Sequence, residues 1–133
     1  MQRCVEYEFL SRSYRLMYNG AAMFALIDKF TSLEGAFEAA MTSTPSGVDA
    51  LYDVWLILAS NGEAVKKWLG YETVPLPEKE KLAAMSNVDD IANMRDAVAA
   101  AIMAGTGREY ESKAKVIDLG LEELEKDRKK KQA

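Results

Sequence analysis

The chain has 133 residues, no histidine and a single cysteine, Cys4. Without histidine it lacks the usual general base of Ser-His and Cys-His sites and the commonest zinc and iron ligand. A single cysteine cannot form a disulfide within the chain, which is typical of a reducing cytosol. We therefore expect no catalytic residues, no metal and no cofactor. We expect Cys4 to be a small structural residue in or beside a strand.

Long apolar runs and an excess of basic residues are also missing. No apolar run approaches the ~20 residues that a membrane-spanning helix needs, so no membrane segment is expected. The formal net charge is −4, and an acidic domain is disfavoured beside a phosphate backbone, so we expect no nucleic-acid partner. The length and the 49% of hydrophobic residues fit one globular domain with an ordinary core.

The most organised part of the sequence is the stretch from Tyr7 to Phe30, where the hydrophobic period changes. Apolar residues first alternate with polar ones on both sides of a small polar turn at 11–13, which predicts a β-hairpin: Val5, Tyr7, Phe9, Tyr14, Leu16 and Tyr18. After Asn19-Gly20 the apolar residues fall on one face of a helix: Met23, Leu26, Ile27 and Phe30.

Helical patterns follow along most of the remaining chain. Ser46, with Asp49 in capping-box position, is predicted to begin a nearly all-apolar helix that passes Trp55 and ends at Asn61-Gly62. Shorter helices are predicted at 33–41, 63–69 and 78–85, with a proline-imposed extended connector at 73–77. Ser86 and Asn87 are predicted to cap a helix that ends at Gly105. Asp89-Asp90 is interpreted as compensation of its dipole rather than as a metal site.

The sequence after residue 107 is highly charged and has only a short apolar stripe: Val116, Ile117, Leu121 and Leu124. We predict a globular helical domain with an N-terminal hairpin over 1–107 and a charged C-terminal helix, partly extended or disordered, over 108–133. The fold class is mainly α with a short N-terminal β-hairpin, a helix-dominated α+β domain of about five to seven helices.

Methionines and aromatics provide the candidate contact residues. Six of the seven methionines follow the first residue, and methionine both fills core gaps and adapts to partner surfaces. Met85, Met94 and Met103 are expected to be exposed, because they flank the proline connector and a thin, alanine-rich helix. Trp68 and Tyr71 are also candidate contact residues, because tryptophan and tyrosine are enriched at protein interfaces. The alternative for the methionines is core filling.

The chain resembles the tail assembly chaperones of long-tailed bacteriophages, in their short, non-frameshifted form. The resemblance covers most of residues 5–105 and rests on three segments, YEFLSRSYRLMYNGAAMFALIDKF, GVDALYDVWLILASNG and SNVDDIANMRDAVAAAIMAG. These proteins typically have a strand pair, an Asn-initiated helix with a late acidic residue, here Asp28, and an apolar helix containing Trp, here Trp55. A Ser/Asn-capped helix ending in an alanine-rich turn follows.

The resemblance implies a binding protein of the host bacterial cytoplasm. It would associate with itself, coat and solubilise the tape measure protein, and be displaced by tail tube subunits, so that the mature virion lacks it. Many phages make a longer form by a −1 ribosomal frameshift, often at an A-rich site translated as consecutive lysines. Lys129-Lys130-Lys131 lies where such a site would be.

Two other functions remain open at this point. The chain could be a small structural component of the virion, of the head–tail joining type, or a cytosolic helical adaptor unrelated to phages. Presence in purified particles separates the first alternative from an assembly chaperone. A gene just upstream of a very long helical reading frame separates the chaperone from the second.

Overall fold

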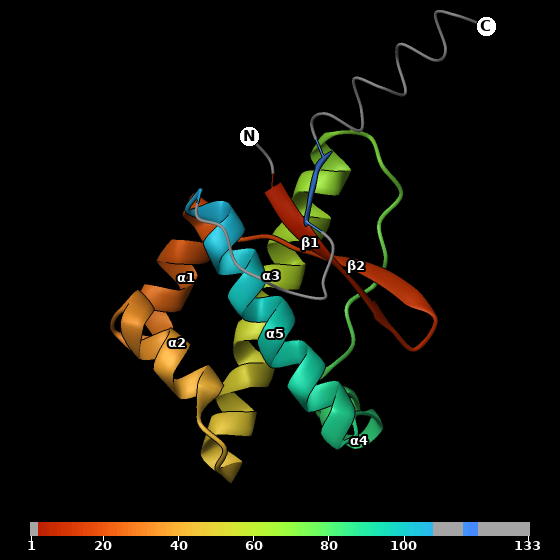
Figure 1. Ribbon diagram of the computed structural model, residues 1–133. Coiled ribbons are helices and arrows are strands. Elements are labelled where there is room, and N and C mark those ends of the chain that lie inside the picture. The colour runs from red at the N-terminus through yellow and green to blue at the C-terminus, as the bar shows by residue number, and fades with distance from the viewer. Residues whose placement is uncertain (1–2, 108–115, 120–133) are drawn as a thin grey trace, which may run out of the picture.

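The fold is known from a computed structural model, which describes residues 3–107 and 116–119 (Figure 1). The elements along the chain are β1 (Arg3–Phe9), β2 (Arg12–Leu16), α1 (Gly20–Phe30), α2 (Leu33–Met41), α3 (Pro45–Trp68), α4 (Lys79–Met85), α5 (Val88–Gly105) and β3 (Val116–Asp118). The predicted class, a helix-dominated α+β domain with an N-terminal hairpin, is confirmed, with five helices among the described residues.

The N-terminal hairpin turns at Leu10 and Ser11, one position earlier than predicted. Both residues have positive φ, 53° and 64°, as a two-residue hairpin loop requires at its central positions. Arg12 therefore already belongs to β2, where it pairs with Phe9. In this register Tyr7 lies opposite Tyr14, so both rings point to the same face of the sheet.

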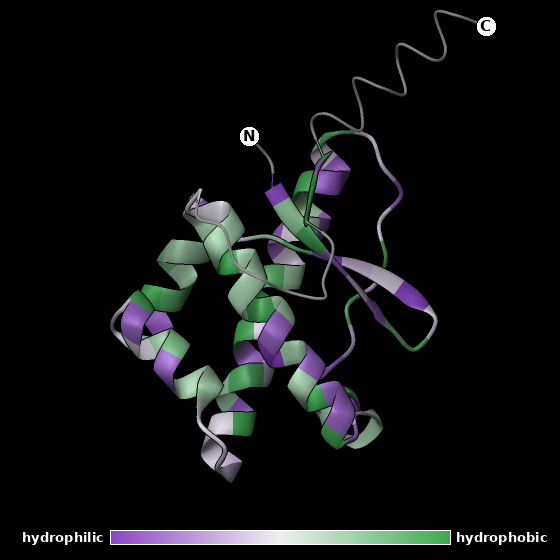
Figure 2. Cartoon of the chain, in the orientation of Figure 1, coloured by the Kyte–Doolittle hydropathy of each residue, from purple (hydrophilic) through white to green (hydrophobic). Residues whose placement is uncertain are grey.

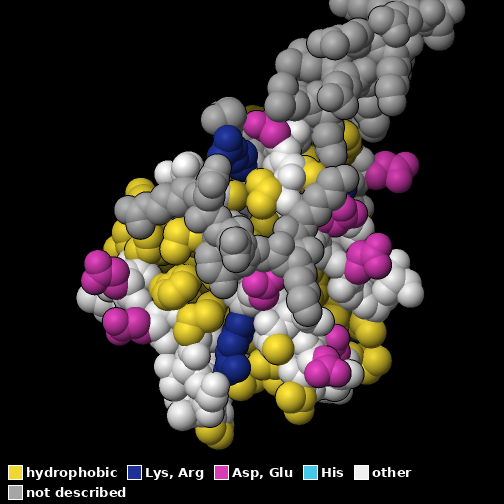
Figure 3. All heavy atoms as spheres, viewed as in Figure 1, with side chains coloured by type: hydrophobic (Ala, Val, Ile, Leu, Met, Phe, Trp, Pro, Cys, Tyr) yellow, Lys and Arg dark blue, Asp and Glu magenta, His cyan; other side chains and the backbone are white. Residues whose placement is uncertain are grey.

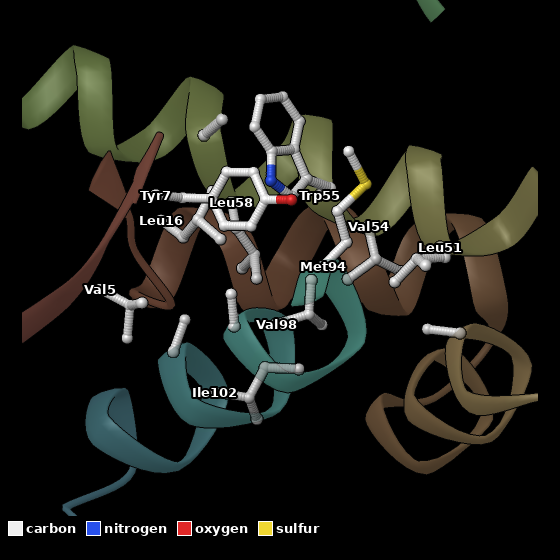
Figure 4. Close-up of a cluster of buried hydrophobic side chains, with 14 of the residues drawn as sticks. Val5, Tyr7, Leu16, Leu51, Val54, Trp55, Leu58, Met94, Val98 and Ile102 are labelled. Atoms are coloured by element: carbon white, nitrogen blue, oxygen red, sulfur yellow. The ribbon is translucent and has the colours of Figure 1, made fainter. Parts of the chain in front are cut away.

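That face of the hairpin packs against α3, the long helix at the centre of the molecule. The indole ring of Trp55 is met edge-on by Tyr7, Phe9 and Tyr14, with ring centroids 5.8, 6.3 and 5.3 Å away. Figure 4 shows side chains from the hairpin, α3 and α5 converging on this region. In Figure 1, α5 crosses in front of α3, with α1 and α2 to one side and the hairpin to the other.

The local signals that start the helices are partly as predicted. Asn19 caps α1 by accepting from the Ala22 backbone N–H, and Asn87 and Asp90 form a complete capping box on α5. The predicted cap of α3 is wrong, because Thr44 accepts the Gly47 N–H while Pro45 occupies the first helical turn. Proline suits that position, where its missing N–H has no intrahelical partner to lose.

The predicted end of the central helix at Asn61-Gly62 is also wrong, because α3 continues to Trp68. A Cβ at position 62 would overlap the backbone carbonyl of Arg15 in β2. Gly62 therefore lets the hairpin approach the helix closely, and it does not end the helix. The short helix predicted at 63–69 is the last part of α3, and the prediction separated it by reading a packing glycine as a stop.

The third strand was predicted as part of a C-terminal helix. Val116–Asp118 instead pairs antiparallel with β1, which gives the strand order β2-β1-β3 and places Cys4 opposite Ile117. Cys4 lies within β1, in agreement with the prediction of a small residue in or beside a strand, and it is buried in a small cluster with Met17, Ile117 and Leu119. Residues 116–118 thus join the same sheet as β1, although the prediction placed them beyond a boundary at 107. The rest of the predicted helix over 108–133 lies outside the described residues.

We predict that Gly62→Ala destabilises the protein by about 1–3 kcal/mol or more, because the added methyl group overlaps backbone that cannot rotate away. Gly20→Ala is the matched control, since nothing lies within 4 Å of a Cβ there, and its effect should be neutral or slightly stabilising. Urea denaturation of both variants measures the difference. Equal stabilities would contradict the close approach of β2 to α3.

Candidate functional site

The five predicted contact residues do not form one surface. Trp68, at the end of α3, is 87% exposed. Tyr71 is half-buried nearby, and its hydroxyl donates to the Leu119 carbonyl at 3.1 Å. Met85 ends α4 and is 52% exposed, whereas Met103 lies half-buried near the end of α5. These side chains therefore lie at the ends of three different helices.

The predicted exposure of Met94 is wrong, because its side chain is 0% exposed. Figure 4 shows it pointing into the core beside Val54 and Trp55. The reason is the alanine-rich sequence around it. Ala97 and Ala101 are buried, so α5 lies close to the sheet and α3, and this half of the helix is internal. The alanine face of α5 packs against α3 and the sheet of the same chain. Met94 is therefore a core residue and cannot contact a partner.

A surface that the sequence reasoning missed lies on α1. The helix buries Ala22 and Leu26, and this leaves Met23, Phe24 and Ile27 on its outer face, with Phe24 74% exposed. The sequence predicted one apolar helix face with Met23, Leu26, Ile27 and Phe30, and of these Leu26 is buried whereas Met23 and Ile27 are 43% and 40% exposed. Figure 2 shows hydrophobic residues along most of α1. The signal available in the sequence was that α1 has more large apolar residues than one helix face can bury.

A second apolar surface is a groove between α2 and α5. It has a volume of about 230 Å³ and is lined by Leu33, Glu34, Phe37, Glu38, Ile102, Met103 and Thr106. Ser32 positions the start of α2 by accepting the Gly35 N–H. Figure 3 shows hydrophobic side chains gathered over α1, α2 and the adjoining part of α5, with acidic side chains at the edge. Met103 is the one predicted contact residue that lines this groove.

Charged side chains form a network that holds α4 against α3. The Lys79 ammonium lies 2.8 Å from a carboxylate oxygen of Asp49 and 3.0 Å from one of Asp53, which also pairs with Lys29. The hydrogen bond to Asp49 raises the pKa of Lys79, and the bond to Asp53 acts in the same direction. The network borders an open hollow of about 740 Å³ that Tyr52 also lines. Its geometry is that of a structural clamp.

A buried ion pair secures the connector that follows α3. Lys66 donates to both carboxylate oxygens of Glu63 at 3.0 and 3.1 Å, and the Val74 backbone N–H donates to the same carboxylate at 2.8 Å. Both charged groups are buried, so removing either one would leave the other as an uncompensated buried charge, which is strongly destabilising. Within 3–107 and 116–119, no group of three or more His, Cys, Asp or Glu residues could hold a metal ion.

None of the described helices is long and apolar enough to cross a membrane. The chain matches no family model, and no curated protein or solved structure matches it. The apolar surfaces available for a partner on the described residues include the α1 face and the α2–α5 groove.

We predict opposite outcomes for one substitution at two methionines. Met94→Asp places a carboxylate in the core and should cost more than about 4 kcal/mol, enough to unfold the chain. Met85→Asp changes a half-exposed side chain and should leave stability within about 0.5 kcal/mol of the wild type. Circular dichroism during thermal unfolding distinguishes the two. A folded Met94→Asp variant would contradict the burial of this residue.

We predict an alkaline loss of stability that depends on Tyr7. Burial, and secondarily the charge of Asp90, raise the pKa of Tyr7 above its ordinary value. An unfolded tyrosine loses its proton near pH ~10 while the folded one keeps it, so the free energy of unfolding falls as the pH rises above that value. The raised pKa of Lys79 acts in the same direction. Tyr7→Phe should flatten this fall in urea titrations between about pH 9 and pH 12; an unchanged slope would contradict it.

Proposed function

We propose that this chain is a non-enzymatic tail assembly chaperone of a long-tailed phage or prophage. In this function it binds and solubilises the tape measure protein in the host bacterial cytoplasm, is displaced by tail tube subunits, and is missing from the mature virion. The proposal draws on the resemblance of the three sequence segments and on one structural observation, the exposed apolar face of α1.

The face of α1 supports a holding function because its residues are large, apolar and outward-facing. Met23, Phe24 and Ile27 lie within about one turn of each other, so they form one contact area. Exposed apolar patches on small proteins mark sites of interaction. A long helical partner that exposes apolar stripes before assembly needs such surfaces to cover it.

Weak individual contacts suit a protein that must later be removed. Three partly exposed side chains provide much less than the ~800 Å² per partner of a stable interface. We therefore expect each copy to bind weakly, and many copies that also associate with each other to hold the partner by avidity. Tube subunits could then displace the copies one at a time.

The test is co-expression of the chain with a tape measure protein of the phage or prophage that encodes it. We expect the wild-type chain to keep the tape measure protein in the soluble fraction, and Phe24→Asp to reduce that soluble fraction severalfold because it places a charge on the α1 face. Val88→Asp, a change of the same kind at another exposed apolar residue, is the matched control and should rescue normally.

Two results would contradict the proposal. One is stoichiometric recovery of the chain from purified virions, which would make it a structural component of the particle. The other is a tape measure protein whose solubility does not depend on the chain at all.

A further inference from the structure

The α2–α5 groove has a floor and a rim of different chemistry. Leu33, Phe37, Ile102 and Met103 supply an apolar floor. A cavity of roughly 150 Å³ with such a lining accommodates a benzene ring. The observed volume of about 230 Å³ is therefore enough for one large apolar side chain inserted from outside.

The rim of the groove is acidic. Glu34 and Glu38 lie on the lining side of α2, four residues apart, and both are exposed. No lysine or arginine lines the groove, and none within 3–107 and 116–119 forms an ion pair with either glutamate. Two basic residues on the neighbouring helices α5 and α1 are engaged elsewhere, since Arg95 donates to the carbonyls of Ala40 and Thr42, and Lys29 pairs with Asp53.

The spacing of the two glutamates matches one turn of a helix. Residues four apart rise by about 6 Å along the axis, so a helix lying along the groove could offer two basic residues at i and i+4 to both carboxylates. The same helix would place an apolar side chain into the floor between α2 and α5. A helix laid into an apolar groove is a common recognition mode.

A second copy of this chain is the less favoured occupant. Each copy carries a formal net charge of −4, so the acidic rim of one copy would face an acidic partner, and like charges brought together at an interface oppose association. The groove selects against such a partner and favours one with basic residues beside its apolar stripe.

We infer that the α2–α5 groove binds an amphipathic helix whose apolar stripe is bordered by lysine or arginine. This inference rests on the proposed function, because the amphipathic helix would be a segment of the tape measure protein.

The test uses two synthetic helical peptides of about 20 residues with the same leucine stripe, one bordered by lysines and one by glutamates. We expect the lysine-bordered peptide to bind the full chain about tenfold more tightly in fluorescence anisotropy. The preference should shrink as salt is added, because exposed charges are screened. The combined change Glu34→Lys and Glu38→Lys should reverse it.

The matched control is the combined change Glu72→Lys and Glu80→Lys, which alters the net charge equally at exposed residues outside the groove. The control should keep the original preference. Equal binding of both peptides, or the same loss in the control and the groove variant, would overturn the inference. So would self-association that the groove variant alone abolishes while neither peptide binds, which would assign the groove to a second copy.

Failure of this inference and failure of the proposed function give different results. If co-expression rescues the tape measure protein but the groove variant rescues it as well as the wild type, the groove assignment is wrong and the holding function stands. If the peptides bind with the expected preference but the tape measure protein is never rescued, the groove is a helix-binding site in a protein of another function.

Discussion

The close packing of the hairpin on α3 is the contact on which the rest of the fold depends. Gly62 gives β2 room beside the helix, and the Met17 N–H donates to the Leu58 carbonyl at 3.0 Å, tying the end of the hairpin to the same helix. Trp55 then fills the space below, surrounded by three aromatic edges. The indole N–H has no hydrogen-bond partner among the described residues, so shape and aromatic contact, not hydrogen bonding, account for its position.

Local signals predicted local structure, and non-local packing decided the rest. Asn19 and Asn87 cap helices whichever way those helices later pack, so both starts were predictable. The role of Gly62 was not, because a glycine that ends a helix and one that admits a neighbouring strand look the same in sequence. The pairing of β3 with β1 joins residues more than a hundred positions apart. A strand of only three residues, Val116–Asp118, is too short for its hydrophobic pattern to indicate a strand.

The exposed contact residues could not be predicted from the sequence for a related reason. Burial of a methionine depends on which helix face meets the core, and the alanines of α5 shift that helix inward until Met94 is enclosed. The same packing leaves α1 at the periphery, where Ala22 and Leu26 are sufficient to attach it and the larger Phe24 remains outside. Exposed residues were therefore identified only once the helices had been placed.

The distribution of side-chain sizes gives the surface its character. Small residues occupy the tight internal contacts of α5, while Met23, Phe24 and Ile27 remain outside on α1. An apolar surface of that kind costs free energy in water unless something covers it. One exposed carboxylate, Asp28, borders the α1 face four residues after Phe24, whereas the α2–α5 groove has two glutamates at its rim. The α1 face, with its three large apolar side chains, would contribute contact area along a helix, while the two glutamates of the groove would set the register where basic residues flank the apolar stripe.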